Sequence, residues 1–477
     1  MLIKNWLSRY SSRYPRALVY MLQASEYTVA DYLAWYHQTK DFSRVEKRKK
    51  LVMTSKAKLL WLATWTMGLV WLGLGAIVLL FNPDFGRVII LLVWVSAAPY
   101  FLAYALIIAL GLVKLVQWPI ENRIIRYSKI KLARHPGLKI AIAGSFGKTS
   151  FREILKTVLA EGRKVAAAPH SYNTPLGISQ FIKSLCGDEE ILIFELGEYY
   201  PGDIKKLCDL VAPQWGIITG VNEAHLEKFK TLEQTTKTIF ELADYLGNQP
   251  LYLNGENQLA QAAAPNQALV YSRTGVGEWQ VINAQTDLAG TKFALTKAGV
   301  EIKVSSSLLG WHQIGPLAAA ADIAFKLGLN AGQIERGLSK TQPFDHRLEP
   351  KIDPQGVIIL DDSYNGNPDG VKAVIDFLAG LKDHQRWYIT PGLVEMGSRK
   401  QTVHQEIGKQ LAASNIEKIV LIKNSATPFI AEGLAAAGYS GKIIWYSDGL
   451  MALQALPHLT VAGDVVLLQN DWPDQYR

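Results

Sequence analysis

Residues 138–150 read Leu-Lys-Ile-Ala-Ile-Ala-Gly-Ser-Phe-Gly-Lys-Thr-Ser, and this stretch decides the fold of the C-terminal two thirds of the chain. The apolar run Leu138–Ala143 predicts a short buried strand, and the residues from Phe151 to Glu161, closed by Gly162, predict a helix. A strand, a glycine turn, Gly-Lys-Thr and a helix form the context that gives a phosphate-binding loop its function, because backbone N–H groups and the helix N-terminus then face the phosphates.

The loop itself is the short form Gly-x-x-Gly-Lys-Thr, since Ile142 rather than glycine lies five residues before Gly147. Lys148 is expected to reach the β- and γ-phosphates, and the Thr149 hydroxyl is expected to hold Mg²⁺. The sequence therefore predicts a nucleotide site formed by Gly144, Ser145, Gly147, Lys148, Thr149 and Ser150.

The composition is that of a folded protein with large cores. The chain has 477 residues, enough for about three domains, with 49% hydrophobic and 19% charged residues. Cys186 and Cys208 are its two cysteines, which excludes a disulfide framework or a cysteine-rich metal site and suits a reducing compartment.

The positive charge is concentrated near the N-terminus. Residues 1–134 carry 19 Lys/Arg against 6 Asp/Glu, whereas the remaining 343 residues carry 31 against 36. Because the basic excess lies beside apolar runs, anionic lipid head groups are the expected partner and nucleic acid is not.

Two uncharged runs predict a transmembrane hairpin. Leu59 to Pro83 is 25 residues long and Val88 to Val113 is 26, and at about 1.5 Å per residue each can cross a hydrocarbon core of about 30 Å. The residues between them, Asn82 to Arg87, have the composition of a turn, and Pro99 is expected to kink the second span.

The flanks of this hairpin predict its orientation. Phe42 to Lys58 carries seven Lys/Arg against one Glu, and Lys114 to Arg134 carries six against one, so both termini and the domains after the hairpin are expected in the cytoplasm. The alternative is a pair of buried core helices in a soluble protein. A cleaved signal peptide is disfavoured because the runs start too far from the N-terminus. Residues 1–56 are expected to be cytoplasmic, either along the membrane surface or as a small helical pack.

Further motifs follow the phosphate-binding loop in a fixed order. Two strand candidates, Ile191–Phe194 and Gly216–Thr219, lead into polar motifs that begin at Glu195 and Gly220. The quoted motifs are Ser171-Tyr172-Asn173-Thr174-Pro175-Leu176-Gly177, Glu195-Leu196-Gly197, Gly220-Val221-Asn222-Glu223-Ala224-His225-Leu226-Glu227, Gly310-Trp311-His312, Asp345-His346-Arg347-Leu348-Glu349 and Asp361-Asp362-Ser363-Tyr364-Asn365-Gly366-Asn367-Pro368.

This ordered set resembles the Mur ligases, most closely the branch that adds D-alanyl-D-alanine to the peptidoglycan precursor. The resemblance covers about residues 138–468. It implies a central P-loop ATPase domain with a mostly parallel sheet and a C-terminal Rossmann-like α/β domain. It also implies the reaction: ATP phosphorylates a substrate carboxylate, an amine attacks the acyl phosphate, and an amide, ADP and phosphate result.

The resemblance assigns roles to residues of this chain. Lys148 and Thr149 would hold the ATP phosphates and one Mg²⁺, Glu195 would ligate that metal, His225 would ligate a second, and Arg347 would contact the γ-phosphate. The other implied nucleotide-binding positions are His312, Gln313, Asp362, Tyr364, Asn365 and Asn367. The implied substrate-binding positions are Asn173, Thr174, Glu395 and His404, of which the last two could equally be structural.

The residue chemistry agrees with this assignment. Glu195 and His225 each follow a strand candidate, and the carboxyl ends of parallel strands are where α/β sheets place ligand-binding groups. Carboxylate, hydroxyl and phosphate oxygens suit Mg²⁺.

Four features depart from the family pattern. The soluble N-terminal domain that grips the UDP-sugar is replaced by the hairpin. The position of the usual carbamylated lysine is Ile239, with Lys237 two residues earlier and on another side of a helix. The usual His-Asn pair reads His312-Gln313, and the usual Lys-Gly-Ser reads Gln469-Asn470-Asp471.

These observations predict five segments. They are a membrane-proximal segment 1–56, a transmembrane hairpin 57–117, a basic linker 118–137, a central ATP-binding domain 138–342 and a C-terminal domain 343–477. In the last, strands are expected at Val357–Asp361, Trp387–Pro391, Lys418–Ile422, Lys442–Trp445 and Asp464–Leu468, with helices between them.

Three functions remain open at this point. The first is ligation of D-Ala-D-Ala to a UDP-linked or lipid-linked muramoyl peptide at the membrane. The second is an ATP-binding scaffold derived from a ligase, and the third is another amide ligase of the same fold, such as a folate polyglutamylating enzyme. The oligomeric state is not predicted.

Overall fold

The computed structural model describes residues 2–46, 50–81, 86–169, 171–222, 229–364, 366–394 and 396–470. The chain divides into two compact units, one covering Met1–Arg123 and the other beginning at Ile124. Most of the turn predicted between the two apolar runs, and the predicted site residues His225, Asn365 and Glu395, lie outside the described residues.

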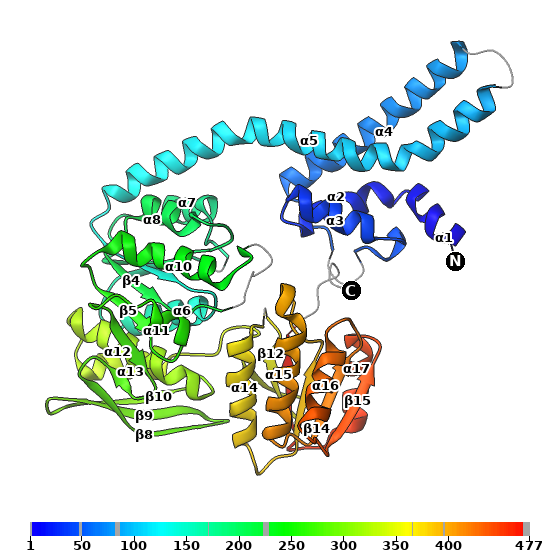
Figure 1. Cartoon of the computed structure of the whole chain (residues 1–477). Coiled ribbons are helices and arrows are strands. Elements are labelled where there is room, and N and C mark those ends of the chain that lie inside the picture. Colours follow the sequence, from blue (N-terminus) through cyan, green and yellow to red (C-terminus); the bar gives the residue numbers. More distant parts are fainter. Residues whose placement is uncertain are drawn as a thin grey trace. The chain divides into compact units, whose positions relative to one another are not determined.

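The N-terminal unit contains two long apolar helices, α4 (Ser55–Phe81) and α5 (Gly86–Ala133), drawn in blue and cyan in Figure 1. Both are long and apolar enough to cross a membrane. In their most apolar stretches of 18 residues, only 11% and 17% of the residues are buried. This exposure disfavours the alternative of core helices in a soluble protein, whose apolar residues would be covered. The second helix continues through Pro99 and Pro119 without interruption.

Residues before α4 form a small helical pack. It comprises α1 (Leu2–Leu7), α2 (Tyr14–Ala24), α3 (Val29–Gln38) and the short turns η1 (Ser8–Tyr10) and η2 (Phe42–Arg44). Its core includes buried residues of α4 and α5, and the Tyr14 and Tyr32 hydroxyls donate to the backbone oxygens of Pro99 and Ala103 at 3.0 and 3.1 Å. Residues 2–46 therefore fold as a helical pack, as one of the two predictions for this segment had it.

The second unit contains two sheets. The strands of the first are β1 (Leu138–Ala143), β2 (Val165–Ala167), β3 (Ile191–Glu195), β4 (Trp215–Ile218), β5 (Leu251–Asn254), β6 (Leu269–Ser272), β7 (Gly275–Val276), β8 (Trp279–Asp287), β9 (Gly290–Lys297) and β10 (Val300–Ser306). They lie in the order β10-β9-β8-β7-β6-β5-β4-β1-β3-β2. The pairs from β2 to β6 are parallel, and those from β6 to β10 are antiparallel.

The prediction of a mostly parallel sheet needs correction here, because the sheet is mixed. The residues of β10 alternate between exposed and buried, which is typical of an antiparallel strand with one wet face. Ala298 and Gly299, at φ 45° and 82°, form the tight turn between β9 and β10.

Helices cover both faces of the parallel part (Figure 1). Alternate residues of β1 point into different cores, Ile140 and Ile142 into one, Ala141 and Ala143 into the other. The first core packs against α6 (Lys148–Leu159), α12 (Ile314–Lys326) and α13 (Ala331–Ser339), and the second against α7 (Pro175–Ser184), α8 (Asp203–Val211) and α10 (Leu232–Leu246). The short α11 (Gln258–Ala262) and the 3-10 turn η3 (Trp311–Gln313) complete this domain.

The second sheet has six strands in the order β11-β12-β16-β13-β14-β15. Its strands are β11 (Glu349–Ile352), β12 (Ile358–Asp362), β13 (Arg386–Thr390), β14 (Lys418–Ile422), β15 (Lys442–Tyr446) and β16 (Val465–Gln469). All pairs except β11–β12 are parallel, so this sheet is mostly parallel as predicted. Its helices are α14 (Pro368–Gly380), α15 (Lys400–Ala413), α16 (Thr427–Ala436) and α17 (Gly449–Leu459), preceded at α15 by the short turn η4 (Gly397–Arg399).

Candidate active site

The loop between β1 and α6 has the backbone that its glycines allow. Gly144 and Gly147 have φ values of 139° and 74°, where other residues are strained. A side chain at Gly144 would also collide with the Thr219 hydroxyl. Because α6 begins at Lys148, its N-terminal N–H groups and helix dipole are available to an anion above the loop.

Lys148 is held across this loop by protein oxygens. Its ammonium group donates to the backbone oxygen of Gly144. It also donates to the two carboxylate oxygens of Glu198, at 2.8 Å from each. The Lys148 side chain is 12% exposed and that of Glu198 only 2%. Glu198 was not among the predicted site residues; its position three residues after Glu195 was the available signal.

Thr149 and Glu195, the predicted metal ligands, lie side by side. The Thr149 hydroxyl is 3.1 and 3.2 Å from the two carboxylate oxygens of Glu195. Arg152, buried and also missed from the sequence, donates to the same carboxylate at 3.2 Å. A hydroxyl and a carboxylate at this spacing suit Mg²⁺, so the residues fit the metal that the sequence resemblance implies.

Ser145 and Asn222 join this loop to the segment after β4. The Asn222 backbone N–H donates to the Ser145 hydroxyl at 3.2 Å, and its side-chain amide donates to Asn367 at 2.8 Å. Asn367 also caps α14 by accepting from Gly370 N–H at 2.9 Å. One hydrogen-bonded path thus connects the phosphate-binding loop with the second sheet.

Arg347, Asp362 and Tyr364 face the same region from the C-terminal domain. The Arg347 guanidinium lies 4.7 Å from the centre of the Tyr364 ring. Burial lowers the pKa of Arg347, while the charges of Asp362, Tyr364 and Glu195 oppose that change. Burial raises the pKa of Asp362 to about 7, although the Arg347 cation pulls it down. Arg347 lines the same cavity as Gly147 and Ser150 of the phosphate-binding loop.

A cavity of about 280 Å³ extends from the loop between the two domains. Its lining includes Gly147, Ser150, Tyr271, Arg273, His312, Gln313, Arg347, Asp362, Tyr364 and Asn367. This volume is slightly below the range of about 300–1,000 Å³ that is usual for small-molecule sites. Eight predicted nucleotide-binding residues therefore share this cavity's wall.

His312 and Gln313 offer polar atoms inside this cavity. The His312 Nε2 is 2.9 Å from the Gln313 side-chain nitrogen, and its buried Nδ1 has no hydrogen-bond partner among the described residues. Burial and the Arg273 cation lower the pKa of His312 to about 4, so the ring is neutral at pH 7. The His312 ring therefore lines the cavity uncharged, while its Nδ1 is enclosed by protein beside Gly310.

The predicted substrate-binding residues have structural partners. The backbone oxygen of Asn173 accepts from Gly197 N–H at 2.9 Å, which fixes the loop beside Glu195, and the Thr174 hydroxyl caps α7. His404 is fully buried, and its two ring nitrogens bond to Leu393 N–H and the Lys400 backbone oxygen. The structure therefore favours the structural alternative for His404.

Two departures from the family pattern have clear positions. Ile239 is completely buried in the core under α10, whereas Lys237 is exposed. Gln469 accepts from the Tyr388 and Thr390 hydroxyls at 3.2 and 3.1 Å, and Asn470 bonds to Gly366 and Gly392. These two amides tie neighbouring loops together where the family has a lysine motif.

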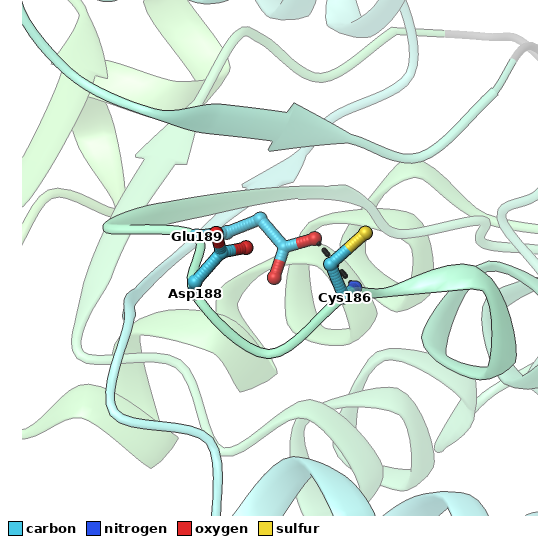
Figure 2. A group of neighbouring side chains, drawn as sticks. All are labelled: Cys186, Asp188 and Glu189. Atoms are coloured by element: carbon cyan, nitrogen blue, oxygen red, sulfur yellow. Dashed lines mark hydrogen bonds between the residues drawn. The ribbon is translucent and has the colours of Figure 1, made fainter.

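A second charged cluster lies before β3, at the opposite edge of the sheet. Ligand atoms of Cys186, Asp188 and Glu189 lie within 4.8 Å of one another (Figure 2). The Glu189 carboxylate already accepts from Cys186 N–H and Gly187 N–H at 2.8 Å and lies 3.0 Å from His135 Nε2. Asp188 pairs with Lys164.

These partners explain the cluster without a metal. Burial alone would raise the pKa of Glu189, but the Cys186 N–H, His135 and Gly187 N–H hydrogen bonds lower it to about 2. Its carboxylate oxygens are committed to the turn that leads into β3, so we assign this cluster a structural role.

Comparisons with known proteins agree with this geometry. The family model for the Mur ligase middle domain matches residues 142–324, and the model for the Mur ligase glutamate ligase domain matches residues 346–469. The UDP-N-acetylmuramoyl-tripeptide–D-alanyl-D-alanine ligase of Mycobacterium tuberculosis is 27% identical over 355 residues, covering 69% of each chain. The Bacillus subtilis ligase of the same name is 25% identical over 332 residues, covering 69% of this chain and 72% of its own.

Two solved structures share the fold. The structure of MurF from Acinetobacter baumannii has a TM-score of 0.65 at 20% identity, covering 73% of this chain and 77% of that one. That of MurF ligase from Thermotoga maritima in complex with ADP has a TM-score of 0.63 at 22% identity, covering 74% and 80%.

Proposed function

Because this chain belongs to the Mur ligase family of ATP-dependent amide ligases, we propose that it joins a muramoyl-peptide carboxylate to D-alanyl-D-alanine at the membrane. The similar curated proteins carry the name of that activity, which supports the choice of substrates. The observation that carries the proposal is the adjacency of Lys148, Thr149 and Glu195 at a loop that opens into a cavity between the two domains.

The phosphate end of the site would work through fixed charges. Lys148 and Arg347 would bind the terminal phosphates, and Thr149 and Glu195 would hold Mg²⁺, with His225 as the expected ligand of a second ion. Magnesium would supply positive charge at the transferred phosphoryl group. The substrate carboxylate oxygen attacks the γ-phosphorus and ADP leaves. The amine of D-Ala-D-Ala then attacks the acyl carbon, releasing phosphate and a proton.

The nucleoside end would occupy the cavity. His312 and Gln313 would contact the base, while Asp362, Tyr364, Asn365 and Asn367 would line the cleft around the sugar and phosphates. The uncharged His312 ring and the Gln313 side chain, which both line the cavity, support this orientation.

The membrane part of the proposal rests on α4 and α5. Both are apolar and largely exposed, and their charged flanks favour a hairpin with both termini in the cytoplasm. Membrane lipid would then surround the hairpin, and the muramoyl-peptide substrate would be either UDP-linked or lipid-linked.

The test is a ligation assay with the full chain in detergent or lipid. The protein is incubated with ATP, Mg²⁺, D-Ala-D-Ala and either a UDP-linked or a lipid-linked muramoyl tripeptide, and product mass and ADP are measured. We expect ADP and an amide product in equal amounts. Consumption of only the UDP-linked form would exclude the lipid-linked substrate. If ADP forms only with another amine, such as glutamate, that amine and not D-Ala-D-Ala is the second substrate.

An ATP-binding scaffold is the second candidate. The burial of Ile239 and the structural use of Gln469 favour it, because neither position provides the family's lysine. Substrate-dependent ADP formation that disappears in Lys148→Ala would exclude the scaffold.

A further inference from the structure

Glu198 has no assigned role, yet it is the main partner of the phosphate-loop lysine. An ammonium group has three N–H donors. The Lys148 nitrogen contacts the Gly144 backbone oxygen and both carboxylate oxygens of Glu198, so its main protein partner is one buried carboxylate. A phosphate that binds Lys148 therefore competes with Glu198 for the same cation.

Binding of Lys148 by a phosphate leaves a carboxylate in an unfavourable position. The Glu198 side chain is 2% exposed, and burying an unpaired charge is costly. The Glu198 carboxylate and the phosphate, both negatively charged, would then lie on either side of the Lys148 ammonium group and repel each other. A cation must replace Lys148, and two carboxylate oxygens beside phosphate oxygens form the hard-oxygen environment that Mg²⁺ and Mn²⁺ prefer.

We propose that Glu198 ligates a divalent cation when the ATP phosphates bind Lys148 in its place. This inference rests on the proposed function, because it assumes that the phosphates bind at this loop. Glu198 would act in addition to Thr149 and Glu195, whose contacts are separate: Glu195 pairs with Thr149 and Arg152, whereas Glu198 pairs with Lys148. The Lys148–Glu198 pair thus makes nucleotide binding depend on the divalent ion.

The test counts bound ions rather than products. The full chain in detergent is titrated with Mn²⁺ in the presence of a non-hydrolysable ATP analogue. Free Mn²⁺ is measured by electron paramagnetic resonance and bound nucleotide by equilibrium dialysis. We expect Glu198→Gln to retain the nucleotide but to bind one Mn²⁺ fewer per chain than the wild type. The exposed carboxylate Glu233 provides a matched control, and Glu233→Gln should behave as the wild type does.

A second measurement is made without divalent ions, where the substitution should strengthen nucleotide binding. Without divalent ions, Glu198→Gln should bind the analogue more tightly than the wild type, by about tenfold, because the competing and repelling carboxylate is gone. A residue with a merely structural role would not reverse its effect in this way. Should Glu198→Gln fail to fold, Glu198→Asp is the substitute, and it should keep the ion with a weaker affinity.

The outcomes separate the two proposals. Equal Mn²⁺ counts in the wild type and Glu198→Gln, with nucleotide bound to both, overturn the role of Glu198 and leave the proposed function intact. Unchanged Mn²⁺ affinity in Glu198→Asp also overturns it. A wild-type chain that binds no nucleotide overturns the proposed function and this inference together.

Discussion

The amino-terminal and carboxyl-terminal ends of the parallel strands form two rims of the ten-stranded sheet, called here the amino edge and the carboxyl edge. Each carries a lysine with little exposed surface and a buried glutamate, whose charges are used differently. At the amino edge, Lys139 donates to the backbone oxygens of His135 and Gly137, and Glu189 accepts from backbone N–H groups. At the carboxyl edge, Lys148 and Glu198 bond mainly to each other.

The difference teaches how to separate a structural charge from a functional one. Backbone partners are part of the turn that they stabilise, so a ligand cannot displace them without unfolding the turn. Side-chain partners can rotate away, and a phosphate or metal ion can take their place. By this criterion Glu189, which accepts from two backbone N–H groups in the cluster of Figure 2, is structural, and we propose that the Lys148–Glu198 pair belongs to a ligand site.

The largest expected effect separates the two lysines. Lys148→Ala should lower ATP turnover in the ligation assay by about 10²–10³-fold or more, because a preorganised cation at the transferred phosphate is lost. Lys139→Ala should lower thermal stability but change turnover of the folded protein by less than about twofold, since it removes only structural hydrogen bonds. Equal losses of turnover in both variants would contradict the distinction between the edges.

A smaller effect is expected for the metal requirement. Glu195→Gln should raise the Mg²⁺ concentration for half-maximal turnover by about 10- to 100-fold, because a neutral amide replaces a carboxylate ligand next to Thr149. The measurement is turnover against Mg²⁺ at saturating ATP. A half-maximal Mg²⁺ concentration that does not move would show that Glu195 only positions Arg152.

A substitution at the amino edge should change the stability of the fold rather than turnover. Glu189→Gln should destabilise the fold by about 2 kcal/mol, because the charged acceptor of several hydrogen bonds is lost. The pKa of Glu189 is lowered to about 2 in the fold, so its contribution is present above the unfolded pKa of about 4.3 and is lost as pH falls toward 2. Thermal unfolding of the wild type and Glu189→Gln should therefore converge on acidification from pH 6 to pH 3. A constant difference across that range would contradict the role of the carboxylate charge.

The smallest effect has the opposite pH dependence. Asp362 has its pKa raised to about 7 by burial, so its contribution to stability is fully present below the unfolded pKa of about 3.9 and is lost as pH rises through 7. Relative to Asp362→Asn, the melting temperature of the wild type should fall by a few degrees between pH 5 and pH 8. Parallel curves would show that Arg347 keeps Asp362 ionised throughout.

The sequence predicted the strands that carry the site more readily than the rest of the sheet. β1 and β14 match the predicted ranges, and the other expected strands agree within one or two residues, because uniform apolar runs mark fully buried parallel strands. The residues of β7–β10 were not assigned. The strands β8 to β10 pair with their neighbours along the chain, but polar residues on their exposed face interrupt the apolar runs that mark the parallel strands.

The residues that gather around the phosphate-binding loop were predicted where they belong to a contiguous motif, and not where only the fold brings them there. Gly144 to Ser150 is a contiguous signal, and Glu195 and Arg347 belong to recognisable motifs. Arg152 and Glu198 were missed, since one resembles an ordinary helix charge and the other a loop charge until β1 and β3 pair in parallel. The structural role of His404 follows from two backbone contacts that no sequence pattern shows.

Photolabelling with 8-azido-ATP tests most directly the claim that the carboxyl edge is the nucleotide site. The full chain is labelled with Mg²⁺ present, digested, and the modified peptides are identified by mass spectrometry. The account predicts ATP-competable label on peptides that contain Tyr271–Arg273 or His312–Gln313, and its loss in Lys148→Ala. Competable label on the peptide that contains Cys186–Glu189, unchanged in Lys148→Ala, would contradict it.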